Sequence, residues 1–257
     1  MKAKEIDQLQ NRAIRYFLGV HKFAANAAIV GDMGWLQPKY SRYLQCIRFW
    51  NRLINMENGR LTKKIFLWDY ECNNNWNTEM ASLFDKLQLR EVHGNKHICD
   101  VNIASDKIND LMQSNWKKEA ENKPKLRTFV LYKHEISPEL YCCRIINRQR
   151  RAIFAQFRSG ILPLKIETGR FRKLKVEERL CEMCDLNKIE DEQHFLCECP
   201  KYSGLRLPLL RKAREQIALF DTLDPQGQFI SLVTIMWREV SFFLEDAWNV
   251  RKSELYQ

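Results

Sequence analysis

One short stretch, Cys181 to Arg206, constrains this chain more than any other part of its sequence. It reads CEMCDLNKIEDEQHFLCECPKYSGLR. Two residues separate Cys181 from Cys184, nine separate Cys184 from His194, and four separate His194 from Cys199. Thiolates and imidazole are the ligands that zinc prefers, and a CxxC pair with a downstream His and Cys is typical of a tetrahedral site. The sequence therefore predicts a zinc ion bound by Cys181, Cys184, His194 and Cys199.

The identity of the fourth ligand has one alternative at this point. Cys197 could replace Cys199, although it lies only three residues after His194. The two residues that follow the histidine, Phe195 and Leu196, are apolar and are expected to pack beneath the ion. Four protein ligands close the coordination sphere and leave no position for water, so we expect a structural zinc ion with no catalytic role.

A strongly basic stretch runs directly into the zinc motif. The whole chain has a formal net charge of +10, and most of this excess lies between residues 144 and 179. Concentrated positive charge is typical of proteins that bind nucleic acids, and the planar guanidinium of arginine suits phosphate. The predicted phosphate contacts are the basic residues of this stretch: Arg144, Arg148, Arg150, Arg151, Arg158, Lys165, Arg170, Arg172, Lys173, Lys175 and Arg179.

An acidic insert separates the two pairs of predicted zinc ligands. It contains Glu190, Asp191 and Glu192 in succession. Like charges repel, so we expect this face of the zinc module to be unsuited to phosphate. Nucleic acid is then expected to contact the basic flank that precedes the first cysteine, with Lys201 and Arg206 after the motif as further candidates.

The rest of the sequence predicts a mostly α-helical protein. Helix-favouring residues dominate many windows, and the 257 residues include only 9 glycines and 7 prolines. The charged segment 117–127, which contains Pro124, is the best candidate for a domain boundary. We therefore expect a multi-helix N-terminal part, residues 1–120, and a basic helical part, residues 121–257, with a zinc-stapled loop and helix at 181–199.

Composition also restricts the location and the class of the protein. No run of about eighteen apolar residues occurs, and the first residues have no apolar segment of the kind found in secretory signals. The 9 cysteines then indicate an intracellular compartment, nuclear or cytoplasmic, where thiols bind metal or are buried. No adjacent aspartate pair, Gly-rich phosphate loop, GxSxG or HExxH occurs, so we expect a binding protein and no enzyme.

Two regions of the chain have a recognisable sequence when taken together. The first is LQNRAIRYFLGVHKFAANAAIVGDMGWLQP, and the second comprises FRSGILPLKIETGRF, KVEERLCEMC and EDEQHFLCECPKYSGLR. These stretches resemble the C-terminal region of non-LTR (LINE-type) retrotransposon endonuclease–reverse transcriptase polyproteins, downstream of the polymerase and with its CCHC zinc motif. The resemblance implies a polyprotein whose polymerase and nuclease lie outside this chain. What is left would be a non-catalytic, nucleic-acid-binding remnant.

Two functions are consistent with these features. The first is a zinc-stapled module that binds RNA or DNA through phosphates, with an affinity that falls steeply as salt rises. The second is a zinc-stabilised protein-interaction or structural module that binds no nucleic acid and whose basic side chains are simply solvated. Exposed arginines on one face would favour the first function, whereas arginines covered by helices or acids would favour the second.

Overall fold

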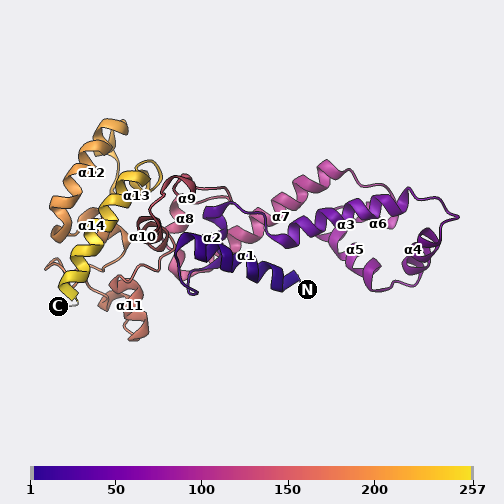
Figure 1. The fold of residues 1–257 in the computed structure, drawn as a ribbon, viewed down its shortest axis with the longest axis horizontal. Helices are drawn as coiled ribbons and strands as arrows, with labels where there is room; N and C mark the ends of the chain where they lie inside the picture. Colours follow the sequence, from indigo (N-terminus) through magenta and orange to yellow (C-terminus); the bar gives the residue numbers. More distant parts are fainter. Residues whose placement is uncertain (1–2, 256–257) are drawn as a thin grey trace. The chain divides into compact units, whose positions relative to one another are not determined.

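A computed structural model describes residues 3–255, and helices make up most of the chain (Figure 1). The helices up to the middle of the chain are α1 (Ala3–Leu18), α2 (Asn26–Met33), α3 (Pro38–Ile54), α4 (Leu61–Glu71), α5 (Asn75–Lys86), α6 (Arg90–Gly94) and α7 (Val101–Glu121). They are followed by α8 (Phe129–Tyr132), α9 (Leu140–Arg144), α10 (Arg148–Arg158), α11 (Lys165–Phe171), α12 (Ser203–Gln216), α13 (Pro225–Thr234) and α14 (Trp237–Leu255).

Short 3₁₀-helical turns, and one π-helical turn (η3), connect these elements. They are η1 (Pro124–Leu126), η2 (Val176–Glu178), η3 (His194–Glu198), η4 (Pro200–Tyr202) and η5 (Phe220–Thr222). Within residues 3–255 no β-strand forms, and one isolated antiparallel bridge joins Leu180 to Ile189. The predicted mostly α fold is therefore confirmed. None of the helices in this range is both long and apolar enough to cross a membrane.

The chain forms two compact units, whose boundaries fall inside α1, in the loop between α2 and α3, and inside α7. Among the described residues, unit 1 holds residues 3–10 and 36–116, and unit 2 holds residues 11–35 and 117–255. The division between residues 120 and 121 stays a prediction about domains. The compact units differ from this predicted division mainly because the segment 11–35 belongs to the same unit as the C-terminal part of the chain.

A buried ion pair explains why this early segment belongs to unit 2. The guanidinium of Arg158 donates to the two carboxylate oxygens of Asp32 at 2.8 and 2.7 Å, and the hydroxyl of Tyr141 donates to the same carboxylate at 2.8 Å. Asp32 and Arg158 are 3% and 1% exposed. Burial alone would lower the pKa of Arg158, but the carboxylate of Asp32 raises it well above its ordinary value. The carboxylate of Asp32 thus favours the charged form of Arg158 inside unit 2.

Unit 1 packs around the indole of Trp50, which is fully buried. Ile47 and Trp50 recur at helical spacing along α3 and place one face of this helix in the core. The rings of Phe66 and Phe84 meet the indole edge-on, with centroids 5.5 and 5.3 Å away. The indole N–H donates to the carbonyl of His97 at 3.0 Å, so its polar atom is satisfied in the core.

Unit 2 is organised around its last helix, α14. This helix packs against α10, α12 and α13, and Figure 1 shows α12, α13 and α14 side by side at the C-terminal end of the chain. Val240, Phe243, Leu244 and Ala247 are buried along it at helical spacing. Arg251, one turn further along, is buried as well. An arginine on an apolar helix face needs a partner, and this partner comes from the predicted zinc module.

Candidate metal centre

A short hairpin presents the first two predicted ligands. The backbone N–H of Cys181 donates to the carbonyl of Lys188 at 2.8 Å, and the N–H of Glu190 donates to the carbonyl of Arg179 at 3.0 Å. These two hydrogen bonds close residues 179–190 into a loop, which we call the cysteine hairpin. Its turn holds the second cysteine of the CxxC pair near the first.

The other two predicted ligands flank η3, a π-helical turn. The carboxylate of Asp191 accepts the backbone N–H of His194 at 2.8 Å and so caps the start of this turn. The N–H of Cys199 donates to the carbonyl of His194 at 2.8 Å, which closes a turn five residues wide. Pro200 follows at once and begins the next helical turn, η4.

The hairpin and the π-helical turn bring all four predicted ligands together. Their ligand atoms lie within 4.8 Å of one another. The Sγ atoms of Cys181 and Cys199 are 3.9 Å apart, and Cys184 Sγ lies 3.5 Å from His194 Nε2. A zinc ion with tetrahedral S and N ligands requires separations of about 3.8 and 3.6 Å. The Cys₃His group could therefore hold a metal ion.

The structure places Cys199 in this group and leaves Cys197 outside it. Cys197 lies inside the π-helical turn, and burial raises its pKa to about 12. Burial also raises the pKa of the Cys181 and Cys199 thiols above the ordinary value. A metal ion must therefore displace protons from these thiols when it binds. Across residues 3–255, this is the one group of His, Cys, Asp or Glu residues placed to hold an ion.

Apolar and polar neighbours surround the four ligands. The side chains of Phe195 and Leu196 are completely buried, as expected for residues beneath an ion. The carboxylate of Glu198 lies 3.5 Å from Nδ1 of His194, the ring nitrogen that faces away from the thiols. A carboxylate at this place is a common orienting partner of a metal-bound histidine, because it keeps the other nitrogen free for the ion.

Arg206 of α12 closes the far side of the π-helical turn. Its guanidinium donates to the carbonyls of Leu196 at 2.6 Å and Cys199 at 2.9 Å. Burial lowers the pKa of this arginine. Arg206 is 6% exposed, so the prediction that it contacts nucleic acid is wrong. No local pattern indicates that a basic residue turns inward to cap carbonyls.

The acidic insert does not form a negative surface, so that prediction is wrong. Glu190 and Glu192 are 0% and 1% exposed. Glu190 pairs with Arg251 of α14, with Nη2 and Oε2 2.8 Å apart, and Glu192 pairs with Arg127 at 2.6 Å. Burial raises the pKa of both carboxyls, that of Glu192 to about 7, and the two arginines oppose the shift. The basic partners lie far away in the sequence, which is why the local pattern misled.

Two of the predicted phosphate contacts are buried and serve the fold. Arg158 is 1% exposed and holds Asp32. Lys165 is 8% exposed and pairs with Glu182 of the cysteine hairpin. The prediction that these two side chains reach phosphate is therefore wrong. Helical periodicity places a residue on a face, but it does not say which neighbour covers that face.

Four further predicted contacts are engaged by other groups of the protein. Arg150, Arg151 and Arg179 are partly buried, and Arg170 is exposed. Their partners are the Glu245 carboxylate for Arg150, the Ile145 and Phe17 carbonyls for Arg151, the Glu167 carboxylate for Arg170, and the Ile166 and Leu174 carbonyls for Arg179. The remaining predicted contacts are exposed and have no ion-pair partner within residues 3–255: Arg144, Arg148, Arg172, Lys173 and Lys175.

The segment Arg170–Lys175, which we call the basic loop, is tied to the cysteine hairpin. Arg179 of the hairpin donates to the carbonyls of Ile166 and Leu174, each at 2.8 Å. The carboxylate of Glu190, also in the hairpin, accepts the first backbone N–H of α11 at 2.7 Å. The cysteine hairpin is thus hydrogen-bonded to the start of α11 and to Leu174 near the end of the basic loop.

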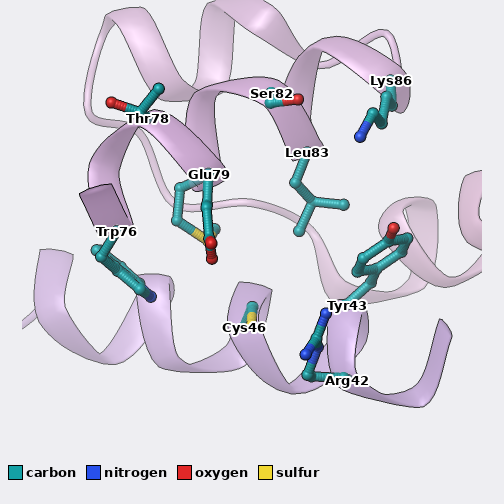
Figure 2. A pocket seen from close by; sticks show the side chains of 10 residues that line it. Arg42, Tyr43, Cys46, Trp76, Thr78, Glu79, Ser82, Leu83 and Lys86 are labelled. Carbon is teal, nitrogen blue, oxygen red and sulfur yellow. The ribbon is translucent and has the colours of Figure 1, made fainter. Parts of the chain in front are cut away.

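Unit 1 contains a separate hollow of about 710 Å³ between α3 and α5 (Figure 2). Arg42 and Tyr43 line it from α3, and Figure 2 shows Glu79 extending from α5 toward Cys46. Burial raises the pKa of Cys46, and Arg42 opposes this shift. A protonated thiol is a poor nucleophile, so this burial disfavours nucleophilic chemistry at Cys46.

Comparisons of the chain with protein-family models, with curated proteins and with solved structures gave no match. The resemblance to LINE-type polyproteins therefore stays a prediction from the sequence. The interpretation of the site rests on the residues of this chain and on their geometry.

Proposed function

We propose that this chain is a non-catalytic nucleic-acid-binding module whose C-terminal unit is stabilised by a structural zinc ion. The donor set supports zinc, because thiolate and imidazole favour it over magnesium or calcium. The separations of Cys181 Sγ from Cys199 Sγ and of Cys184 Sγ from His194 Nε2 are close to those around a tetrahedral ion. Cys181, Cys184, His194 and Cys199 would supply all four ligands, so the ion would hold the fold and would activate no water.

The link between the cysteine hairpin and the basic loop is the observation that supports this function best. Arg179 and Glu190 anchor α11 from the hairpin, and the loop that follows α11 exposes Arg172, Lys173 and Lys175. Phe171 directly precedes these cations in the sequence and is 72% exposed. Cations interleaved with an exposed aromatic ring suit a phosphate backbone and its bases.

The resemblance to LINE-type polyproteins supports the same proposal. In such a polyprotein, this module would hold RNA or DNA for catalytic parts that lie outside the chain. The alternative function, a protein-interaction module, is favoured by the internal pairing of Arg150 and Arg158. The two functions are separated by the binding experiment below.

The test is the affinity of the zinc-loaded chain for duplex DNA, single-stranded DNA and a structured RNA across a salt series. We expect a linear fall of log affinity with log salt, with a slope of roughly 0.7 to 0.9 for each phosphate contacted. The variant Arg172→Ser/Lys173→Ser is expected to lower this slope by roughly 1 to 2 and to bind less tightly. Removal of the ion by a chelator should weaken binding in the same salt range.

A charge-matched control makes the result specific. Arg211→Ser/Lys212→Ser removes the same charge from exposed positions of α12 in the same unit. Equal losses in the two double variants would show that net charge alone drives binding. Failure to bind any of the three nucleic acids, with zinc present and the chain folded, would reject the proposal in favour of a protein-interaction module.

A further inference from the structure

The C-terminal half of α1 lies directly against α10 within unit 2. Gly19 ends α1 with a φ of +69°, and a Cβ at this position would lie 2.6 Å from Cβ of Ala152 in α10. The side-chain amide of Gln156 donates to the carbonyl of Gly19 at 3.2 Å, and Nε of Arg151 donates to the carbonyl of Phe17 at 3.1 Å. This close approach fixes the last turn of α1 beside the first turn of α10.

Arginines of the first turn of α10 lie over aromatic rings of the helices beside it. The pairs, with the distance from guanidinium carbon to ring centre, are Arg148–Tyr16 at 4.8 Å, Arg151–Phe17 at 4.5 Å and Arg150–Phe242 at 3.8 Å. These distances are typical of cation–π contacts. A guanidinium that stacks on a ring has its orientation fixed before a ligand binds. Its outer face and the uncovered face of the ring are then available to the same ligand.

The α1 side of this arrangement carries positive charge that is not paired with an acid among residues 3–255. Arg150 is paired with Glu245, but Arg148 is exposed and has no ion-pair partner among residues 3–255. Arg151 donates only to backbone carbonyls. The ring of Tyr16 is 74% exposed and that of Phe17 is 38% exposed. We call these four residues, Tyr16, Phe17, Arg148 and Arg151, the α1–α10 patch.

We propose that the α1–α10 patch stacks unpaired bases, and that the nucleic acid bound by this chain is therefore single-stranded. This inference rests on the proposed function and specifies its ligand. The charge of the patch is complementary to a phosphate backbone, and its exposed rings offer flat faces to bases. Bases of a duplex already stack on each other and cannot lie on Tyr16, whereas unpaired bases can.

The test compares a single-stranded oligonucleotide with the duplex of the same sequence, both bound to the full-length zinc-loaded chain. Tyr16→Leu keeps an apolar side chain and removes the ring. We expect it to weaken single-strand binding at least about fivefold and to change duplex binding less than about twofold. Tyr16→Phe keeps the ring and should bind as the original chain does. Trp68→Leu removes an exposed ring of unit 1 and serves as the matched control.

A second measurement locates the bases directly. A single strand with 5-iodouracil should crosslink on irradiation to the peptide that contains Tyr16 and Phe17. Crosslinks confined to other peptides would overturn the inference, and so would equal losses of single-strand and duplex affinity in Tyr16→Leu.

The inference can fail separately from the proposed function. If Arg172→Ser/Lys173→Ser weakens binding while Tyr16→Leu changes nothing, the α1–α10 patch has no role and the module still binds nucleic acid. If polyglutamate displaces the single strand as well as an unlabelled strand does, the patch recognises charge alone. If the chain binds no nucleic acid at all, both proposals are rejected.

Discussion

Glu190 and Arg251 form an ion pair inside unit 2 that joins the cysteine hairpin to the last helix of the protein. Both guanidinium Nη atoms donate to the carboxylate, one of them at 2.8 Å, and both side chains are at most 2% exposed. The same carboxylate accepts the backbone N–H of Lys165 at 2.7 Å and lies 3.7 Å from Sγ of Cys181. One buried acid thus connects the predicted metal centre, α11 and α14.

Removal of the basic partner should therefore destabilise unit 2 strongly. Arg251→Met leaves Glu190 charged and unpaired in the interior, which costs about 3–5 kcal/mol for a buried pair. Urea unfolding of the zinc-loaded variant, followed by circular dichroism, measures this loss. The control Arg214→Met breaks the exposed pair of Arg214 with Asp221 and should cost about 0–1 kcal/mol. Similar losses in the two variants would contradict the structural role of Arg251.

The two candidate cysteines near the end of the zinc motif should differ sharply in metal binding. Cys199→Ser removes a thiol that lies 3.9 Å from Cys181 Sγ, whereas Cys197→Ser removes one outside the cluster. We expect Cys197→Ser to keep one zinc per chain and Cys199→Ser to lose most of it. Elemental analysis after gel filtration measures the zinc, and the ligand-field spectrum of a cobalt-substituted chain reports tetrahedral geometry. Retention of zinc by Cys199→Ser with loss in Cys197→Ser would reverse the assignment.

Gly19 should tolerate no larger residue. Its φ of +69° is a conformation that costs other residues about 1 kcal/mol or more, and a Cβ would lie 2.6 Å from Ala152. Gly19→Ala is therefore expected to lower the free energy of unfolding by roughly 1–3 kcal/mol. Thermal unfolding measures the loss. Gly204→Ala in α12 is the control, because nothing lies within 4 Å of an added Cβ there. It should be neutral or stabilise by about 0.5–1 kcal/mol.

Arg158 should affect stability and not nucleic-acid binding. Asp32→Asn removes the charge that holds this buried guanidinium, and we expect a loss of about 3–5 kcal/mol. The fraction of Asp32→Asn chains that stays folded should bind nucleic acid with unchanged salt dependence. A fluorescence binding assay on the folded fraction, isolated by gel filtration, checks this. An Arg158→Met variant that binds with a reduced salt slope at unchanged stability would restore Arg158 as a phosphate contact.

The metal ligands were predictable because their arrangement is local. Cys181 and Cys184 share one turn, and His194 and Cys199 flank another. Backbone hydrogen bonds over a few residues set the directions of these side chains, so spacing alone contains most of the geometry. Helices such as α3 were predictable for the same reason, since Ile47 and Trp50 repeat at the helical period.

Whether each charged side chain is buried in an ion pair or exposed to solvent depended on tertiary structure. The partner of Glu190 is 61 residues away in the sequence, and the partner of Arg158 is 126 residues away. No local pattern encodes such a pairing, because burial of a charge is decided by which distant segment supplies the opposite charge. The sequence by itself therefore determined the Cys₃His group and the helical character of this protein. Only the tertiary structure decided which of its basic residues stabilise the interior and which remain on the surface.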